Sequence, residues 1–382
     1  MKKFIYDVVL EASDICNLEN EVKILEKEIS QGRRVVMYGR RNTGKTSLVQ
    51  AIILPHFLSK NKKLLIIDVD MMGVSSLQEI QRRLRIAFER GLSKANPGQS
   101  YLSVLIKSIR GIRPALNLSP TSGELSFSLG IDTGAAEPEL EDLFSAIVKY
   151  HKAHGTLIVF DEFQDISEIK GAQALIRGVL QRLPSDLPVI ILGSKKNLLA
   201  KIFAVPQAPL AGWGRDVQIP DLEDPVYQKK YHNFINERLD SENKQMPLDV
   251  AIQLMKKSQF IPETVNIVCD VLLNDSNPAK GKIQWEHVLR ALQKAVEQRK
   301  GRYEERLSLL RASERDVLIA VAKHEPIPKL KGKDFLRHLR NLSPTTVYQV
   351  TQTLDRRSDL HQTAEGYVLA DALFAEFLRQ YR

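Results

Sequence analysis

The residues with the clearest chemical potential form a glycine-rich run, Gly39-Arg40-Arg41-Asn42-Thr43-Gly44-Lys45-Thr46, which fits the pattern G-x-x-x-x-G-K-[ST]. A strand-like run at 35–38 precedes it and a helical pattern follows it. Such a turn points successive backbone N–H groups at a phosphate, while the lysine adds charge and the threonine offers a hydroxyl to Mg²⁺. The alternative is a surface turn. The sequence predicts a nucleotide site formed by Gly39, Asn42, Thr43, Gly44, Lys45, Thr46 and Ser47, with Thr46 also a metal ligand.

Two carboxylates, Asp161 and Glu162, follow the apolar run 157–160. Acidic side chains at the end of a buried strand are costly unless an electropositive group faces them. A Mg²⁺–nucleotide complex is such a group, so Asp161 is predicted to hold the metal and Glu162 to act as general base toward water. The alternative is that both residues merely cap the next helix.

Two further positions are catalytic candidates. Ser194 follows the apolar run 189–192, where a polar residue would lie beside the γ-phosphate and sense hydrolysis, with Asn197 a second candidate. Arg215 follows Gly212-Trp213-Gly214, and we predict an arginine finger acting in cis or in a neighbouring subunit. Simple loop propensity at Ser194 and a solvated arginine are the alternatives.

Predicted strands and helices alternate along the first 220 residues, and these elements would position the candidate residues. Short apolar runs at 35–38, 64–69, 157–160, 189–192 and 217–219 are separated by helical patterns. Continuous apolarity indicates strands covered on both faces, and therefore an α/β fold with a parallel sheet. Residues 113–131 alternate around a Pro120–Gly123 turn, which predicts an inserted hairpin. We divide the chain into a nucleotide domain at 1–222, a helical domain at 223–300 and a third domain at 301–382.

Composition limits the class of protein. Hydrophobic residues make up 43% and charged residues 26% of the 382 residues, which argues against intrinsic disorder. Cys16 and Cys269 cannot form a disulfide framework or a cysteine-rich metal site. There is no apolar run of about 18 residues and no signal-peptide core, so we expect a cytoplasmic protein without a membrane partner.

The net charge of +9 is concentrated near the C-terminus. Residues 281–382 contain 19 basic and 13 acidic side chains, and so carry most of the excess. Summed positive potential attracts phosphate polymers, although surplus lysines also serve solubility.

The glycine-rich run, together with Phe160-Asp161-Glu162-Phe163-Gln164-Asp165, resembles the archaeal-type P-loop ATPase family of the STAND branch, related to AAA+ origin-recognition ATPases. The resemblance implies an ATP- and Mg²⁺-dependent ATPase with a helical lid and a C-terminal winged helix. It also implies that Pro262, in Phe260-Ile261-Pro262, lies against the adenine. Glu263 stands where origin-recognition ATPases carry a lid arginine, which implies slow hydrolysis.

The last 80 residues fit a winged helix on their own pattern. Helical spacing runs through 313–322 and 334–339, Ser343-Pro344 starts a third helix, and 360–369 reads as the wing with Gly366 in its turn. The third helix is expected to bury Val347, Val350 and Leu354 and to expose Thr345, Tyr348, Gln349, Gln352 and Arg356.

Such a polar face suits base edges and phosphates, so residues 303–382 are predicted to bind double-stranded DNA. Flanking basic residues would neutralise backbone charge: Lys329, Lys331, Lys333, Arg337, Arg340 and Arg357. The alternative is a signalling switch in which the winged helix is an autoinhibitory or protein-interaction module, with self-association or a protein partner.

Overall fold

The computed structural model describes residues 3–16, 18–96, 98, 105, 112–118, 125–131, 140–194, 199, 202–203, 210–276, 280–339 and 341–382, with backbone alone at 112–118 and 125–131. The chain forms two compact units. One is Val9–Pro220, and the other combines Met1–Val8 with Asp221–Arg382. The division into three domains stays a prediction. No helix in the described part of the chain is long and apolar enough to cross a membrane.

A five-stranded sheet is the centre of the first unit. Its strands lie in the order β2-β5-β6-β1-β7, and every neighbouring pair is parallel. The bounds are β1 (Arg34–Tyr38), β2 (Leu65–Asp70), β5 (Thr156–Asp161), β6 (Val189–Gly193) and β7 (Arg215–Gln218). The parallel α/β sheet predicted from the apolar runs is confirmed, and all five runs are strands.

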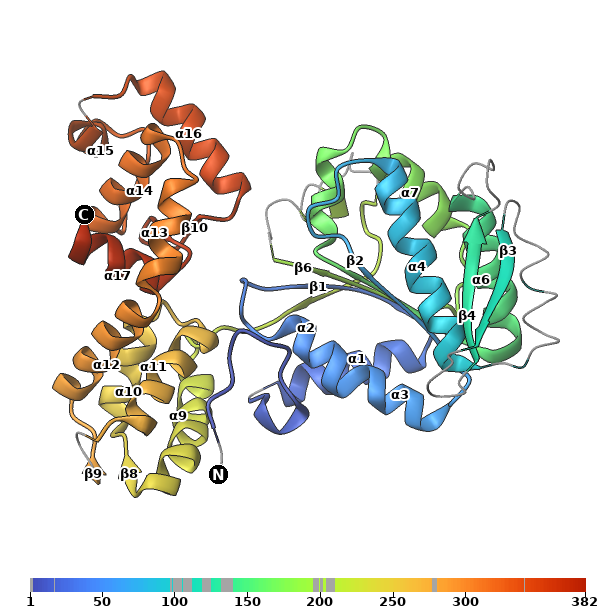
Figure 1. The fold of residues 1–382 in the computed structure, drawn as a ribbon, viewed down its shortest axis with the longest axis horizontal. Helices are drawn as coiled ribbons and strands as arrows, with labels where there is room; N and C mark the ends of the chain where they lie inside the picture. The colour runs from blue at the N-terminus through green and yellow to red at the C-terminus, as the bar shows by residue number, and fades with distance from the viewer. Residues whose placement is uncertain are drawn as a thin grey trace. The chain divides into compact units, whose positions relative to one another are not determined.

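Helices cover both faces of this sheet, as Figure 1 shows. Alternate strand residues face opposite sides, so Val35 and Met37 join one apolar core while Val36 joins the other. One face carries α1 (Glu19–Ser30) and the helical run from α2 (Lys45–Leu48) through η2 (Val49–Ile53) to α3 (Leu54–Lys60). The other carries α4 (Leu77–Ala95), α6 (Leu140–His154) and α7 (Ala172–Gln181). Short 3₁₀ turns are η1 (Ala12–Asp14) and η3 (Phe163–Glu168).

The helix that follows the glycine-rich turn changes its winding at η2, which is a π-helix. Pro55 lies in the first turn of α3, directly after it. A proline inside a helix has no N–H for the residue four positions back, and its ring clashes with that carbonyl. Wider winding just before Pro55 accommodates the ring while the helix continues.

Two further strands lie in the segment where the sequence predicts a hairpin. β3 (Ile112–Leu118) and β4 (Leu125–Ile131) pair antiparallel, with Leu118 opposite Leu125.

The second unit begins with a set of helices. It contains α9 (Pro225–Leu239), η4 (Asp240–Glu242), β8 (Lys244–Gln245), α10 (Leu248–Lys257), α11 (Pro262–Asn274), β9 (Gly281–Lys282) and α12 (Trp285–Gln298). The N-terminal segment packs on it: Phe4 is buried, Asn266 Nδ2 donates to the Ile5 carbonyl at 3.0 Å, and Tyr6 Oη donates to Asp270 at 3.1 Å.

The same unit ends in the predicted winged helix. Its elements are α13 (Lys300–Ser308), α14 (Ala312–His324), α15 (Lys333–Leu336), η5 (Arg337–Leu339), α16 (Pro344–Arg356), β10 (Leu360–Gln362), β11 (Tyr367–Leu369) and α17 (Ala372–Tyr381). The wing is the antiparallel pair β10–β11, and Ile327 bridges to Tyr367. Gly366 has φ 147°, and a Cβ there would lie 2.5 Å from the Ile327 backbone. The fold predicted for this domain is confirmed, except that 337–339 winds as a 3₁₀ turn.

Gly91 tests the packing of α4 on the sheet. A Cβ at this position would lie 2.3 Å from the Ile66 carbonyl oxygen of β2. We therefore expect Gly91→Ala to lower the free energy of unfolding by about 1–3 kcal/mol, the range for an overpacked core, despite the higher helix propensity of alanine. Urea unfolding of the full chain, followed by circular dichroism, measures the change.

Gly178 in α7 provides the matched control, because a Cβ there meets only the Arg182 guanidinium at 4.0 Å. Gly178→Ala should be neutral or stabilising by up to about 1 kcal/mol. Equal effects of the two substitutions would contradict the close approach of α4 to β2.

Candidate functional site

The glycine-rich turn connects the end of β1 to the start of α2 at the carboxyl edge of the sheet. Gly44 adopts φ 90° and Asn42 φ 61°, both in the left-handed region that reverses the chain tightly. Gly39 passes close to its neighbours, since a Cβ there would lie 3.0 Å from Ile219 Cβ. Thr43 Oγ1 donates to the Arg40 carbonyl at 2.8 Å. The turn is therefore preformed by its own residues.

Lys45 is buried under this turn. Its Nζ donates to the carbonyls of Gly39 at 2.9 Å and Arg40 at 2.7 Å. Burial lowers the pKa of Lys45 to about 8, against the opposing attraction of the Glu162 and Asp161 carboxylates. The ammonium thus lies where it can exchange two carbonyl partners for an anion.

Thr46 and Asp161 meet directly, although 115 positions separate them in sequence. Thr46 Oγ1 donates to Asp161 Oδ2 at 2.6 Å, and the Glu162 N–H donates to Asp161 Oδ1 at 2.8 Å. Burial raises the pKa of Asp161, while the Thr46 hydrogen bond acts to lower it. A hydroxyl and a carboxylate are hard oxygen donors that suit Mg²⁺, which takes few protein ligands beside water and phosphate. Among the described residues no cluster of three or more His, Cys, Asp or Glu forms a metal site.

Glu162 is held by groups from two strand ends. Its backbone has φ 48°, and its Oε2 accepts hydrogen bonds from Ser194 Oγ at 2.7 Å and from Gln164 Nε2. Ser194 directly follows β6, and its hydrogen bond brings two residues together that the sequence named as separate catalytic candidates, a sensor and a base. The other sensor candidate, Asn197, lies outside the described residues.

Gln164 and Asp68 belong to the same region, and sequence reasoning missed both. Gln164 is fully buried beside Glu162, and the mixed polar and apolar sequence of the turn, Phe163 to Glu168, does not distinguish it from its neighbours. Asp68 lies on β2 next to β5 and accepts from Gln50 Nε2 at 2.8 Å. Burial, with the Asp161 charge, raises the pKa of Asp68 to about 6.

Arg215 lies away from these residues, at the opposite edge of the sheet. In the parallel register it pairs with Val35, whereas the glycine-rich turn follows Tyr38, which pairs with Gln218. Its guanidinium forms an ion pair with buried Glu28. Burial acts to raise the pKa of Glu28, but Arg215 and Arg33 hold it below its usual value. Arg215 therefore does not face the turn of its own chain.

Two other predicted residues have roles in their own units. Ser47 Oγ accepts the Leu10 N–H at 3.1 Å, which ties the N-terminal segment to α2. Pro262 is the first residue of α11 in the second unit, and its carbonyl accepts a hydrogen bond from Tyr231 Oη at 3.2 Å.

The predicted nucleic-acid face lies on α16. The side chains expected to be buried and exposed on this helix are so in the structure. Lys331 Nζ lies 3.7 Å from the centre of the Tyr348 ring, and Gln352 Nε2 donates to Tyr348 Oη at 2.6 Å. Arg357, expected to meet phosphate, pairs with buried Glu314 at 3.0 Å.

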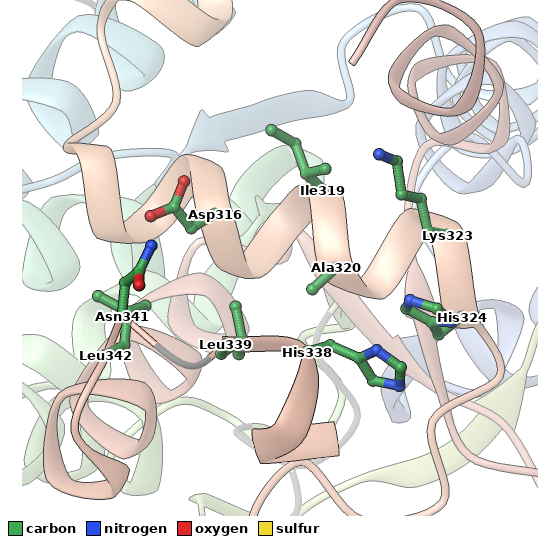
Figure 2. Close-up of a pocket in the computed structure, with 9 residues that line it drawn as sticks. All are labelled: Asp316, Ile319, Ala320, Lys323, His324, His338, Leu339, Asn341 and Leu342. Atoms are coloured by element: carbon green, nitrogen blue, oxygen red, sulfur yellow. The ribbon is translucent and has the colours of Figure 1, made fainter. Parts of the chain in front are cut away.

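A pocket of about 290 Å³ lies elsewhere in the winged helix, between α14 and residues 338–339 and 341–342 (Figure 2). The rings of His324 and His338 stack at its edge, with centres 3.6 Å apart. Burial lowers the pKa of His324, and the neighbouring His338 and Lys323 add to this. The residues that line the pocket do not come from α16, so it is separate from the predicted nucleic-acid face.

The chain is similar to known proteins in its C-terminal domain and in its overall fold. Residues 301–380 match the family described as a probable winged helix domain. Comparison with curated proteins finds no match. A Walker-type ATPase of Pyrococcus abyssi has a similar structure, with a TM-score of 0.62 at 20% identity over 98% of this chain and 99% of that one. The ORC1 protein of Aeropyrum pernix, solved in complex with DNA, gives 0.50 at 14% identity over 99% and 95%.

Both solved structures align over nearly the whole chain, and the family match covers its last fifth. The fold implied by the sequence resemblance is thereby confirmed. The chain has the fold of an archaeal-type P-loop ATPase that ends in a winged-helix domain.

Proposed function

We propose that the protein is an ATP-binding, Mg²⁺-dependent switch that hydrolyses ATP slowly and associates with double-stranded DNA through its winged helix. The observation that carries the nucleotide part is the 2.6 Å contact between Thr46 and Asp161, directly beside the preformed glycine-rich turn. Hydroxyl and carboxylate meet where the turn's N–H groups and Lys45 would hold the phosphates. In phosphoryl transfer a protein contributes mainly by positioning the reactants and by stabilising charge, and these residues could do both.

Each side chain has a distinct part in the proposed reaction. Lys45 would transfer its hydrogen bonds from the Gly39 and Arg40 carbonyls to phosphate oxygens. Mg²⁺ held by Thr46 and Asp161 would neutralise charge on the same phosphates. Glu162 would accept a proton from the attacking water, and Ser194 would report the loss of the γ-phosphate through their shared hydrogen bond.

A switch also requires a connection from the nucleotide to the rest of the chain. The chain passes between the units at Val8–Val9 and at Pro220–Asp221. The Ile219 N–H donates to the Tyr38 carbonyl at 2.8 Å, and the Leu222 N–H donates to the Phe260 carbonyl at 3.3 Å, two residues before Pro262. The short stretch from Ile219 to Leu222 is thus hydrogen-bonded at one end to Tyr38, before the glycine-rich turn, and at the other to Phe260, near Pro262.

The DNA part rests on charge and on the face of α16. The exposed Tyr348 and Gln352 lie together with the Lys331 ammonium, a combination of hydrogen-bonding and cationic groups that suits a duplex groove. The structurally similar ORC1 protein was solved with DNA, which supports the same class of ligand here.

A second candidate is a signalling switch whose winged helix contacts protein. The ion pair of Arg357 with buried Glu314, at 3.0 Å, favours it, because an arginine predicted to neutralise DNA phosphate is already paired within the chain. Self-association belongs to this candidate too, with Arg215 as a finger toward a neighbouring copy.

Lys45→Ala tests the phosphate turn. Charge-assisted hydrogen bonds are worth about 1.5–3 kcal/mol each, so we expect the Kd for ATP to rise by about 100-fold or more. Isothermal titration calorimetry with Mg²⁺–ATP measures this, and exposed Lys62→Ala serves as the control for removal of one positive charge. Unchanged affinity in Lys45→Ala would remove the phosphate-turn assignment.

The same titration has a second readout, in pH. With a pKa of about 8 in the free protein, a fraction of Lys45 is neutral at pH 8, and bound phosphate favours the ammonium form. Binding should therefore take up protons, and affinity should fall as the pH rises from 7 to 9. The proton uptake should be absent from Lys45→Ala.

Glu162→Gln tests the general base. The amide cannot accept a proton from water, so we expect kcat for phosphate release to fall by about 10²–10⁴-fold while ATP still binds. The exposed Glu168→Gln, in the same segment, is the control and should retain full activity. Turnover at the wild-type rate in Glu162→Gln would exclude Glu162 as the base.

Salt dependence tests the DNA part. For the full chain, log K for duplex DNA should fall linearly with log salt concentration. Lys331→Glu or Arg356→Glu should reduce the slope by about one unit, because each removes one cation that neutralises a phosphate. Fluorescence anisotropy with labelled duplex measures both, and Lys62→Glu is the charge-matched control in the other unit. No binding at low salt would favour the protein-interaction candidate.

A further inference from the structure

We infer that Gln164 is a positioning residue for hydrolysis, which fixes the Glu162 carboxylate and Ser194 in one geometry at the ends of β5 and β6. The inference rests on the proposed ATPase function and deepens it, since it assigns the orientation of the base to a residue that acts through Glu162.

The side-chain amide of Gln164 forms several hydrogen bonds at a buried position. Gln164 is fully buried, and its Nε2 donates to Glu162 Oε2 and, at 3.2 Å, to Asp165 Oδ1. Its Oε1 accepts the Ser194 N–H at 3.3 Å. A buried amide is stable only when its polar groups form hydrogen bonds. These contacts therefore satisfy the amide and also connect Glu162 to Ser194.

The orientation of this amide is set by its neighbours. Two carboxylates lie on the Nε2 side, and a backbone N–H lies on the Oε1 side, so a flipped amide would place like groups together on both sides. Asp165 is itself held, because its Oδ2 accepts the Gly73 N–H at 2.9 Å. The donor aimed at Glu162 therefore has a fixed direction.

Close approach at β6 shows that the backbone accommodates this side chain. A Cβ at Gly193 would lie 2.5 Å from Gln164 Oε1, so a larger residue there would displace the amide from its present position. The Gly193 carbonyl also accepts the Gly39 N–H at 3.3 Å, at the start of the phosphate turn. The Gln164 amide therefore contacts the end of β6, and the same strand end is hydrogen-bonded to the start of the glycine-rich turn.

The arrangement has a consequence for the base. Gln164 Nε2 and Ser194 Oγ both donate to Oε2 of Glu162, which leaves Oε1 as the oxygen we assign to proton acceptance. Without the amide, a single hydroxyl would hold the carboxylate, and rotation about the side-chain bonds would reduce the time spent in the reactive orientation.

Gln164→Met and Gln164→Glu test the inference in the full chain. Met keeps the length and removes the hydrogen bonds; Glu keeps the shape and replaces the donor with a carboxylate beside Glu162. We expect kcat for ATP hydrolysis to fall by about 10–100-fold in both, with the Kd for ATP within about twofold of wild type. In a Glu162→Gln background, Gln164→Met should cause no further fall, because the residue acts through Glu162.

Phe163→Leu controls for packing. Phe163 is buried beside Gln164, and its ring packs against those of Phe160 and Phe203, so its truncation loosens the same turn without touching Glu162. It should lower the free energy of unfolding and leave kcat unchanged. If Gln164→Met does not fold, Gln164→Leu, which also lacks hydrogen-bonding groups, replaces it.

The outcomes separate the inference from the proposed function. Wild-type kcat in a folded Gln164 variant, with Glu162→Gln inactive, would overturn the inference and leave the ATPase proposal intact. A further fall of kcat in the double variant would also overturn it, since Gln164 would then act independently of Glu162. Full activity of Glu162→Gln would overturn both.

Discussion

The site depends on one electrostatic constraint: opposite charges are buried at the same edge of a parallel sheet. Burial lowers the pKa of Lys45 and raises that of Asp161, so each group is pushed toward its neutral form, while attraction between them opposes this. The chain reduces the cost by giving every charge a short hydrogen bond, to turn carbonyls for Lys45 and to Thr46 for Asp161. A bound anion and a divalent cation would satisfy the same groups more completely, which is why this edge suits the proposed ligand.

Parallel strand order brings these groups together. The carboxyl ends of β1, β5 and β6 lie at one edge, so Tyr38, Asp161 and Gly193 end neighbouring strands although 155 positions separate the first from the last. The register also explains why Arg215 lies elsewhere: it begins β7, and in a parallel sheet the start of a strand is at the far edge. Position along a strand therefore decides which predicted residues can share the site.

Sequence patterns predicted the sheet, the turn and the winged helix because each depends on local features: apolar runs, glycines at fixed spacing, and Ser343 as a helix cap. Thr46 was predicted as a Mg²⁺ ligand from the glycine-rich motif and Asp161 from the end of an apolar run, and the structure joins the two by a hydrogen bond. Gln164 and Asp68 could not be predicted in the same way. Their roles depend on which strands are neighbours and on a close approach at Gly193, and neither is encoded in local spacing. Arg215 was predicted as an arginine finger because glycines precede it. Its ion pair with Glu28 could not be predicted, because the two residues are 187 positions apart in sequence.

The organisation into two units has a thermodynamic consequence for the proposed switch. The helical set that contains Pro262 and the winged helix belong to one compact unit, linked by the Lys257–Glu376 ion pair. If nucleotide binds two arrangements of the units with different affinity, then any partner of the winged helix that also distinguishes these arrangements must be coupled to nucleotide. The coupling is reciprocal, so a partner that favours the ATP-bound arrangement must tighten ATP binding by the same factor.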